Sequence, residues 1–463
     1  MKRIFFIISL LAFSASWVSA QDKKQYNVLM IAVDDLNDWT GFLGGHPQTQ
    51  TPNMDRLAQN GQVFTQAYCA ASVCNPSRTA LMSGYRPSTT GALGNGYKLR
   101  SSPLLKDAPM LNQWFQQNGY YTLSRGKIFH HPDTDNDKWD EWSNNDGRYG
   151  KPAKKKEGKE YSGLPTSEYD GNLNWGGTTA AKEDTPDYRT AQWAAEQLQK
   201  ERDKPFFMAV GIFRPHLSWF VPQQYFDKFP TATLQMPEVK ADDLDDIPGE
   251  KPSKEYRLVK KHGLEKEAVQ AYLASINYAD ECIGVILDAL DKSPYRDNTI
   301  VVLWGDHGWH LGEKLRYKKF TLWERAARMP LIVSAPGVTK SGARSEQIVS
   351  LLDLYPTLTE LCGLPENTTN EGTSFLPLLK NPNKKWNVPA VTTLKEGHSL
   401  RVEHWRYIRR HDGVEELYDH QQDPKEYTNL AMDKKYEDKL KDLRKLMDKT
   451  ITPKDKALTG KSK

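Results

Sequence analysis

The chain has 463 residues, of which 38% are hydrophobic and 26% are charged, and its formal net charge at pH 7 is +4. A chain of this size can form a main domain with a substantial core and a second, smaller domain. The near balance of acidic and basic residues argues against a protein held on nucleic acid by its global charge, so local charge has to recognise the ligand.

The first twenty residues have the composition of a secretory signal peptide. Residues 1–3 supply a basic start, residues 4–13 are apolar, and residues 18–20 supply small side chains before Gln21. An uncleaved anchor is the alternative, but this stretch is shorter than the ~20 apolar residues that span a bilayer. We therefore predict a signal peptide over residues 1–20 that is cleaved near Ala20. The mature protein is then periplasmic or secreted, with no integral membrane segment.

Apolar runs along the chain predict buried strands that end at polar residues. The run at residues 27–33 ends at Asp34, the run at 204–213 precedes His216, and the run at 299–304 precedes Asp306. Continuous apolar runs are typical of strands buried on both faces of a parallel sheet. The predicted fold class is therefore α/β, with a large mixed, mostly parallel sheet flanked by helices.

Helical patterns alternate with these strands. We predict a helix from a cap at Asn53 through residue 58, stopped by Gly61, and then a strand over 63–67 that leads to a helix beginning at Cys74. Residues 264–290 place apolar side chains at helical spacing, and a further helix covers 351–361. The stripe of the long helix is interpreted as core rather than as a cofactor site.

The C-terminal part has a different pattern. Short aromatic strands are predicted at 405–408 and 416–418, followed by an amphipathic helix over 434–447 and a Lys-rich tail. We therefore predict a catalytic domain over residues 21–385 and a small antiparallel α+β subdomain over 386–463. The basic segment 151–159 is interpreted as a solvated loop, with contact to an anionic polymer as the alternative.

Acidic residues follow two distant strands and indicate a metal site. Asp34 and Asp35 end the first strand, and Asp306 and His307 follow another. Ligands gather at the carboxyl ends of strands in open α/β sheets. Carboxylates that converge on one point repel one another unless a cation lies among them. Ca²⁺ is the predicted cation and Mg²⁺ is the alternative, with His307 as a nitrogen ligand or a hydrogen-bonding neighbour of the ligands.

One cysteine occupies a distinctive context. Residues 74–84 read CNPSRTALMSG, which places Cys74 where a helix begins and Arg78 one turn further on the same face. The free N–H groups of a helix N-terminus favour developing negative charge. The alternative is a structural cysteine, bridged to Cys69, with Arg78 in a surface salt bridge. With only four cysteines in the chain, at most one disulfide is expected once Cys74 is used.

The eleven residues from Cys74 resemble the formylglycine-forming signature of the type I sulfatases, which belong to the alkaline phosphatase superfamily. Residues 119–130, GYYTLSRGKIFH, resemble the second signature of that family. Two residues separate Lys127 from His130, as in the iduronate 2-sulfatase branch, and residues 306–313, DHGWHLGE, support that branch. The resemblance covers nearly the whole mature chain and implies an alkaline phosphatase-like fold.

The resemblance also implies roles for individual residues. Cys74, converted to formylglycine by a maturation enzyme, supplies a geminal diol that attacks sulfur, and elimination of sulfate then restores the aldehyde. The adjacent Lys318 is an alternative to Lys319 as the last sulfate-binding lysine. The implied set comprises the metal ligands Asp34, Asp35, Cys74, Asp306 and His307, the diol neighbour Arg78, the sulfate-binding residues Lys127, His216 and Lys319, and the base His130.

The implied reaction is hydrolysis of sulfate esters on sugars, with a 2-O-sulfated uronic acid of a sulfated oligosaccharide or polysaccharide as the suggested substrate. The leaving-group acid is His216 or Lys319. Trp39, His46 and residues 95–100 are predicted to line the entrance, with packing as the alternative for Trp39. Two other functions stay open: a phosphate mono- or diester hydrolase of the same superfamily, and a noncatalytic protein that binds sulfated glycans.

Overall fold

The computed structural model of the protein describes residues 25–130, 135–143, 160–169 and 171–452. The predicted signal peptide with its cleavage site near Ala20 lies outside the described residues, and so does the basic segment 151–159. Across the described ranges, we find no helix whose length and apolar character would let it cross a membrane.

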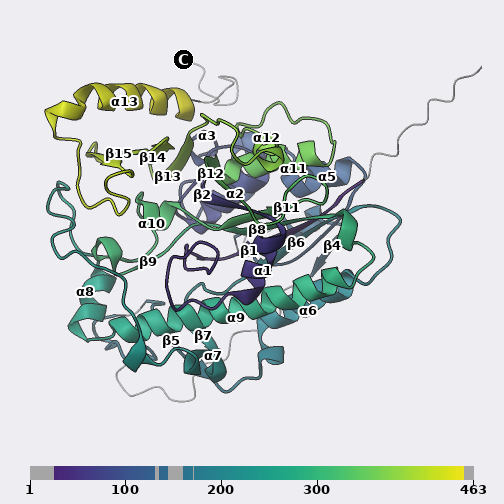
Figure 1. Ribbon diagram of the computed structural model, residues 1–463, viewed down its shortest axis with the longest axis horizontal. Coiled ribbons are helices and arrows are strands. Elements are labelled where there is room, and N and C mark those ends of the chain that lie inside the picture. Colours follow the sequence, from purple (N-terminus) through teal and green to yellow (C-terminus); the bar gives the residue numbers. More distant parts are fainter. Residues whose placement is uncertain (1–24, 131–134, 144–159, 170, 453–463) are drawn as a thin grey trace, which may run out of the picture.

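A mixed, mostly parallel sheet of eight strands forms the centre of the described structure (Figure 1). Neighbouring strands pair in parallel except β11, which is antiparallel to both of its neighbours. This arrangement confirms the predicted α/β fold class. In spatial order the strands are β12 (Ala343–Ser350), β2 (Gln62–Tyr68), β11 (Leu331–Ser334), β8 (Thr299–Gly305), β1 (Asn27–Val33), β6 (Phe206–Ile212), β3 (Tyr121–Gly126) and β4 (Glu141–Ser143).

The central strand β1 explains why the sheet lies between two helical layers. All of its residues are buried, and successive side chains enter opposite cores: Leu29 and Ile31 on one face, Met30 and Ala32 on the other. Burial of a large apolar side chain stabilises the fold by about 1.5–3 kcal/mol. A strand that is apolar on both faces is therefore stable only with helices on both sides.

Helices cover each face of the sheet (Figure 1). One face packs against α1 (Pro52–Asn60), α6 (Pro186–Gln197), α7 (Gln223–Asp227) and α9 (Glu265–Asp291). The other face packs against α2 (Cys74–Ser83), α5 (Leu111–Gln117), α11 (Leu354–Leu361) and α12 (Leu376–Lys380). Shorter elements are α3 (Pro87–Thr90), α4 (Pro103–Lys106), α8 (Lys254–Lys261), α10 (Glu324–Ala327), and the strand pairs β5 (Trp175–Thr178) with β7 (Trp219–Pro222) and β9 (His310–Leu311) with β10 (Tyr317–Lys318).

The predicted cap of α1 is wrong. The helix begins at Pro52 rather than after Asn53, because a carboxylate from another helix satisfies its first N–H groups. The backbone N–H and side-chain amide of Asn53 donate to Asp280 Oδ2 at 3.1 and 2.9 Å, and the N–H of Met54 donates to Oδ1 at 2.8 Å. A negative charge supplied by α9 thus stabilises the N-terminus of α1.

The C-terminal subdomain is a four-stranded antiparallel sheet with one helix packed on it (Figure 1). Its elements are β13 (Ala390–Leu394), β14 (Gly397–Val402), β15 (Trp405–Arg409), β16 (Glu415–Asp419) and α13 (Glu437–Ile451). Thr393 N–H donates to Ala70 O at 2.8 Å, and Thr392 Oγ1 donates to Cys69 O at 2.7 Å. The smaller α+β subdomain is therefore present and docks just before Cys74, while the boundary at residue 385 stays a prediction.

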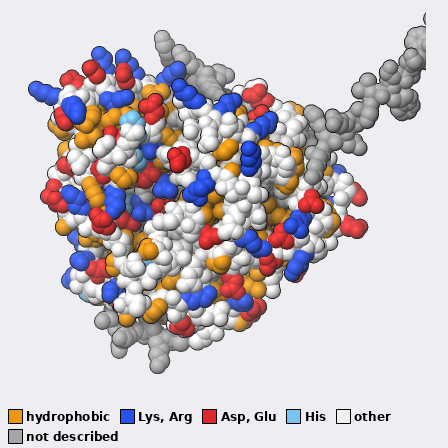
Figure 2. All heavy atoms as spheres, in the orientation of Figure 1, with side chains coloured by type: hydrophobic (Ala, Val, Ile, Leu, Met, Phe, Trp, Pro, Cys, Tyr) orange, Lys and Arg blue, Asp and Glu red, His pale blue; other side chains and the backbone are white. Residues whose placement is uncertain are grey.

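The visible surface carries charges of both signs. Figure 2 shows acidic and basic side chains interspersed over this face, in keeping with the small net charge of +4. Mixed charge of this kind gives no long-range field of one sign. Charges that select a ligand therefore have to be sought inside the fold.

Candidate active site

Strand register brings the predicted acidic residues to one edge of the sheet. Val33, the last residue of β1, lies beside Gly305 of β8 and Ile212 of β6. The residues that follow β1 and β8 therefore leave the sheet side by side. Asp34, Asp35, Asp306 and His307 are all completely buried there.

Cys74 faces this group of side chains from the first turn of α2. Its Sγ lies 3.8 Å from Asp35 Oδ1, 3.3 Å from His307 Nε2 and 2.8 Å from Lys319 Nζ. The alternative bridge to Cys69 is not formed, because all four cysteines are free thiols. The structure therefore places Cys74 among the predicted metal-binding residues.

Arg78 lies inside the cluster rather than on the surface. Its Nε donates to Asp306 Oδ2 at 2.8 Å, and its Nη2 donates to Asp34 Oδ1 at 3.4 Å. The guanidinium also donates to Ile128 O at 3.1 Å and lies over the Trp304 ring. This buried arginine holds two strand-end carboxylates in fixed positions.

Three further predicted basic side chains reach Asp34 or Asp35. The Nζ of Lys127 donates to Asp34 Oδ2, and the Nζ of Lys319 donates to Asp35 Oδ1 at 2.5 Å. His216 is partly exposed, with its Nε2 3.9 Å from Asp35 Oδ2. Lys318 points to a different partner, Glu255 Oε1 at 3.1 Å, so Lys319 is the lysine that joins the cluster.

His130 lies on the segment that follows β3. It is partly exposed, and the two preceding residues, Ile128 and Phe129, are buried in the core. These two residues anchor the segment that carries both Lys127 and His130. The role of His130 as a base stays a prediction.

The backbone at Asp35 is held in an uncommon conformation. Its φ of 62° lies in the left-handed region, which aspartate tolerates better than most residues. Its carbonyl accepts a hydrogen bond from Tyr272 Oη at 2.7 Å, and its N–H donates to Asp306 Oδ1 at 3.0 Å. Contacts from α9 and from the residue that follows β8 thus fix a conformation that costs about 1–3 kcal/mol, as is common at functional sites.

One oxygen of this cluster supports the expectation of a cation. Asp35 Oδ2 is buried and accepts no hydrogen bond from the part of the chain that the structure describes. Two overlapping sets of possible ligand atoms each lie within 4.8 Å of one another: those of Asp34, Asp35, Cys74 and His216, and those of Asp34, Cys74, Asp306 and His307. A set rich in carboxylate oxygens with an unsatisfied member fits a hard divalent cation.

Burial and the neighbouring charges shift the pKa values of these groups in different directions. Burial alone raises the pKa of Asp34, but attraction to Lys127 outweighs it and the pKa falls below its usual value. Against the same effect of burial, Arg78 holds the pKa of Asp306 well below its usual range. At Asp35 burial dominates over attraction to Lys319, so the pKa is raised.

Burial also raises the pKa of the Cys74 thiol, although Lys127 and Lys319 partly oppose that effect. The thiol is therefore protonated at neutral pH. Because the thiolate is the nucleophilic form of cysteine, unmodified Cys74 is a poor nucleophile here.

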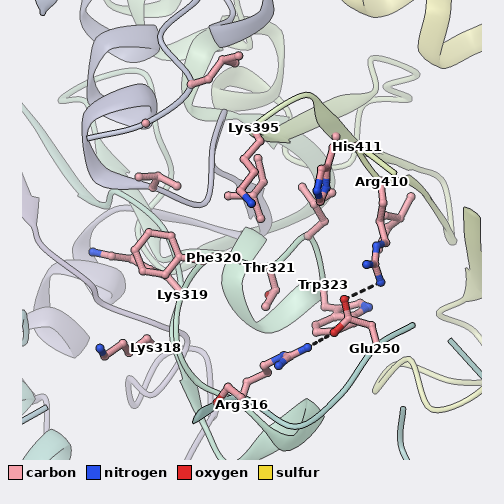
Figure 3. Close-up of a pocket in the computed structure, with 18 of the residues that line it drawn as sticks. Glu250, Arg316, Lys318, Lys319, Phe320, Thr321, Trp323, Lys395, Arg410 and His411 are labelled. Carbon is pink, nitrogen blue, oxygen red and sulfur yellow. Dashed lines mark hydrogen bonds and ion pairs between the residues drawn. The ribbon is translucent and has the colours of Figure 1, made fainter. Parts of the chain in front are cut away.

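A cavity of about 770 Å³, drawn in Figure 3, shares Lys319 with the cluster. Val73 and Lys319 line it, so it adjoins Cys74, and Asn95 from the predicted entrance segment lines it as well. Trp39 and His46 line a separate cavity of about 440 Å³. Trp39 is buried against Tyr272 and His46, so packing is the role that the structure gives it.

Several residues of the larger cavity were not found from the sequence. Phe320 directly follows Lys319, and an aromatic residue beside a predicted sulfate-binding lysine was a signal that could have indicated it. Lys395, Arg410 and His411 come from the C-terminal subdomain. They follow no sequence pattern that places them near Lys319, and only the docking of that subdomain brings them there.

The mixed eight-stranded sheet flanked by helices, with the small antiparallel subdomain, has the alkaline phosphatase-like fold. Residues 26–364 match the sulfatase family, and residues 305–452 match the C-terminal region of N-sulphoglucosamine sulphohydrolase. The chain belongs to the sulfatase family and is a sulfuric ester hydrolase.

Relatives agree with this assignment, and solved structures share the fold. The chain is 39% identical to a sulfatase of Formosa agariphila, covering 92% of this chain and 86% of the relative, and 30% identical to the iduronate 2-sulfatase of Homo sapiens, covering 73% and 69%. The structure of a 2-O GAG sulfatase superposes with a TM-score of 0.70 at 23% identity, covering 94% of each chain. A phosphonate monoester hydrolase from Silicibacter pomeroyi superposes with a TM-score of 0.75 at 20% identity, covering 94% and 97%, and therefore shares the fold.

Proposed function

We propose that this enzyme removes sulfate from a sulfated saccharide after Cys74 has been converted to formylglycine. The observation that carries the proposal is the position of Cys74 Sγ, which lies within 4 Å of Asp35, His307 and Lys319. Similarity to iduronate 2-sulfatase and to a 2-O GAG sulfatase makes a 2-O-sulfated uronic acid the first substrate to test. Formylglycine supplies a hydrated aldehyde, one hydroxyl of which is the nucleophile toward sulfur.

Asp34, Asp35, Asp306 and His307 would hold one divalent cation, with Ca²⁺ as the first candidate and Mg²⁺ as the second. The carboxylate oxygens and the unsatisfied Asp35 Oδ2 support this choice. A cation bound there lowers the pKa of a hydroxyl that it contacts.

The cationic side chains around Cys74 have distinct tasks in this proposal. Lys127, Lys319 and His216 bind the sulfate oxygens, and Arg78 keeps Asp34 and Asp306 in place. Burial lowers the pKa of His216 well below its usual value, so His216 can act as an acid only after the negative charge of a bound sulfate has raised its pKa and it has taken up a proton. His216 or Lys319 protonates the departing sugar oxygen, and His130 accepts the proton whose removal expels sulfate.

Maturation and export complete the proposed function. A formylglycine-generating enzyme would act on the segment that begins at Cys74, and the signal peptide over residues 1–20 would direct the protein to the periplasm or outside the cell. Cys74 is buried in the folded protein, so conversion before folding is complete is the route that we propose.

Expression with a maturation system, followed by peptide mass spectrometry at Cys74, tests the modification. Sulfate release from defined sulfated oligosaccharides tests the reaction, with phosphate and phosphonate monoesters as comparison substrates. Cys74→Ala should abolish sulfate release, whereas Cys362→Ala, a thiol far along the chain, should retain it. An unmodified Cys74 in an enzyme that still hydrolyses sulfate esters would disprove the formylglycine step. Preference for phosphate or phosphonate esters would disprove the substrate class.

A further inference from the structure

The 770 Å³ cavity beside Lys319 is much larger than a sulfate group requires. Its walls come from four parts of the chain: Val73 with residues 93–95, residues 250–255, the segment from Arg316 to Trp323, and the C-terminal sheet at Lys395, Arg410 and His411 (Figure 3). Lys319 lines this cavity and also contacts Cys74 Sγ, so the cavity adjoins the place where the proposed function puts the sulfate group. The inference below therefore rests on the proposed function.

Most basic side chains of the cavity already have carboxylate partners. Glu250 lies between Arg316 and Arg410 and pairs with both, as the dashed lines in Figure 3 show. Lys318 pairs with Glu255 at 3.1 Å. These pairs form the floor and side of the cavity, and each cation has its charge balanced within the protein.

Lys395 differs from them. It is exposed in the turn between β13 and β14, and it lines the cavity opposite the segment that carries Lys319. Among the residues that the structure describes, Lys395 has no carboxylate within ion-pair distance. In Figure 3 its amino group extends into the space between Phe320 and His411. A cation placed in this way is available to an anionic group of a ligand.

Phe320 is the second unusual feature of the cavity. Its side chain is 49% exposed, which is rare for a phenylalanine, and its φ of 72° lies in the left-handed region. A bulky residue in that region is strained, and such strain persists mainly at functional sites. The ring therefore offers an apolar face to the cavity directly beside the sulfate-binding Lys319.

We propose that this cavity binds the saccharide beyond the sulfated position and selects a polyanionic chain. Phe320 contacts the apolar face of a sugar ring, and Lys395 binds a second anionic group, a carboxylate or a second sulfate, on the same saccharide. The substrate class is thus a saccharide with at least two anionic groups. The C-terminal subdomain takes part in recognition through Lys395.

A matched pair of substrates tests the role of Lys395. One is a sulfated disaccharide with a uronic acid carboxylate, and the other is the same disaccharide with that carboxyl group reduced to an alcohol. Lys395→Met should raise KM for the first substrate by about tenfold, the value of one charge-assisted hydrogen bond. It should leave KM for the second substrate and kcat for both within about twofold.

Two control variants separate this effect from a general change of surface charge. Glu396→Gln changes the neighbouring residue of the same turn, which does not line the cavity, and Lys340→Met removes an exposed lysine elsewhere. Both should behave like the wild type with either substrate. If Lys395→Met weakens both substrates equally, or neither, Lys395 does not recognise a second anion and the inference fails.

Phe320 is tested by the pair Phe320→Ala and Phe320→Tyr. Alanine has to adopt the same left-handed backbone conformation but lacks the ring, so KM for the disaccharide should rise by about five- to tenfold. Tyrosine retains an aromatic ring and should give the KM of the wild type. Met432→Ala, which truncates a side chain that is 83% exposed, is the apolar control. Unchanged KM in Phe320→Ala, with folding confirmed by circular dichroism, would show that the ring makes no contact with the substrate.

The failure of this inference can be told apart from the failure of the proposed function. If the matured wild-type enzyme cleaves no sulfate ester, the proposed function is wrong whatever the variants do. Calorimetric binding of the intact disaccharide to Cys74→Ser, with and without Lys395→Met, then still tests the cavity. Equal affinity in both proteins would overturn the inference.

Discussion

Two buried clusters of charged side chains in this protein are similar in composition. They differ in whether every carboxylate oxygen has a hydrogen-bond partner. One surrounds Cys74 and contains three aspartates, and the other joins Glu324 and Glu426 to His420 and Arg406 at the edge of the C-terminal sheet. Each brings several possible metal ligands together. The contrast between them shows how a buried acidic cluster can be assigned to structure or to function.

In the second cluster every carboxylate oxygen has a partner. The two oxygens of Glu324 accept from Tyr68 Oη at 3.1 Å and from Arg406. Those of Glu426 accept from His420 Nε2 at 2.9 Å and from the N–H of Glu324 at 2.8 Å. Arg406 takes the place that a metal ion would fill, so this cluster is a structural link between the subdomain and the main sheet.

The cluster at Cys74 is incomplete by the same criterion. Asp35 Oδ2 is buried without a hydrogen-bond donor from the described residues, and Asp35 itself has a left-handed backbone. Buried polar groups without partners are rare and indicate a missing ion, water or ligand. The second cluster also has a buried atom without a hydrogen-bond partner, Arg406 Nε, but that atom forms an ion pair with Glu426. Among the described carboxylate oxygens of the two clusters, only Asp35 Oδ2 lacks a donor, and this distinguishes the cluster that we propose to be functional.

The largest expected effect is the difference in kcat/KM between substitutions at two adjacent lysines. Lys319→Ala should lower kcat/KM for a sulfate ester at least about 10³-fold, because it removes a buried cation that faces both Asp35 and Cys74. Lys318→Ala removes a lysine that pairs with Glu255 and should stay within about tenfold of the wild type. Initial-rate kinetics measure both, and equal losses would show that the two positions do not differ in function.

Breaking the structural cluster should cost stability. Arg406→Met leaves Glu324 and Glu426 buried without their shared cation, and loss of one partner of a buried pair costs about 3–5 kcal/mol. Urea unfolding measures the loss. Arg444→Met is the control, because its pair with Glu415 is partly exposed to solvent and should contribute no more than about 1 kcal/mol. A loss below about 1 kcal/mol in Arg406→Met would contradict a structural role.

The C-terminal subdomain should also make stability depend on pH through His398. Burial, assisted by repulsion from Arg409, lowers the pKa of His398 to about 4. In the unfolded chain His398 takes up a proton near pH 6.5, whereas in the folded protein it does so only near pH 4. The free energy of unfolding is therefore highest above pH 6.5 and decreases as pH falls toward 4, by at most about 3 kcal/mol.

Urea unfolding between pH 4 and 7 checks this prediction against His398→Asn. Asparagine can still hydrogen-bond to Thr393 Oγ1, which lies 3.1 Å from His398 Nδ1, but it does not titrate. The variant should lose less stability than the wild type over this interval. Parallel curves for the two proteins would show that His398 does not contribute.

The smallest expected effect compares the clusters directly through Ca²⁺. Saturating Ca²⁺ should raise the free energy of unfolding of the wild type by about 2.7 kcal/mol at a hundredfold excess over Kd. Asp35→Asn should lose most of this increase, whereas His420→Gln, in the structural cluster, should retain it. Differential scanning fluorimetry with and without chelator measures the shift in Tm. A shift lost only in His420→Gln would reverse the assignment of the two clusters.

Much of the main domain could be predicted from local pattern. The apolar run that became β1 (Asn27–Val33), the long helix α9 (Glu265–Asp291) and the helix that begins at Cys74 all follow from periodicity and composition. The cap at Asn53 could not be predicted, because the carboxylate of Asp280 that replaces it lies 227 residues away in the chain. Local patterns indicate which faces of a helix or strand are buried. They do not indicate which residue from a distant part of the chain packs against such a face.

The sequence by itself determined that two strand ends carry acids, that a helix starts at Cys74 and that Arg78 lies on the same face of that helix. Only the tertiary structure decided that Lys319 rather than Lys318 faces Cys74, that Phe320 remains exposed in a strained conformation, and that Lys395 reaches the same cavity. The physical reason is that burial patterns depend on neighbours along the chain, whereas the direction of a loop cation depends on the packing of segments far apart in sequence.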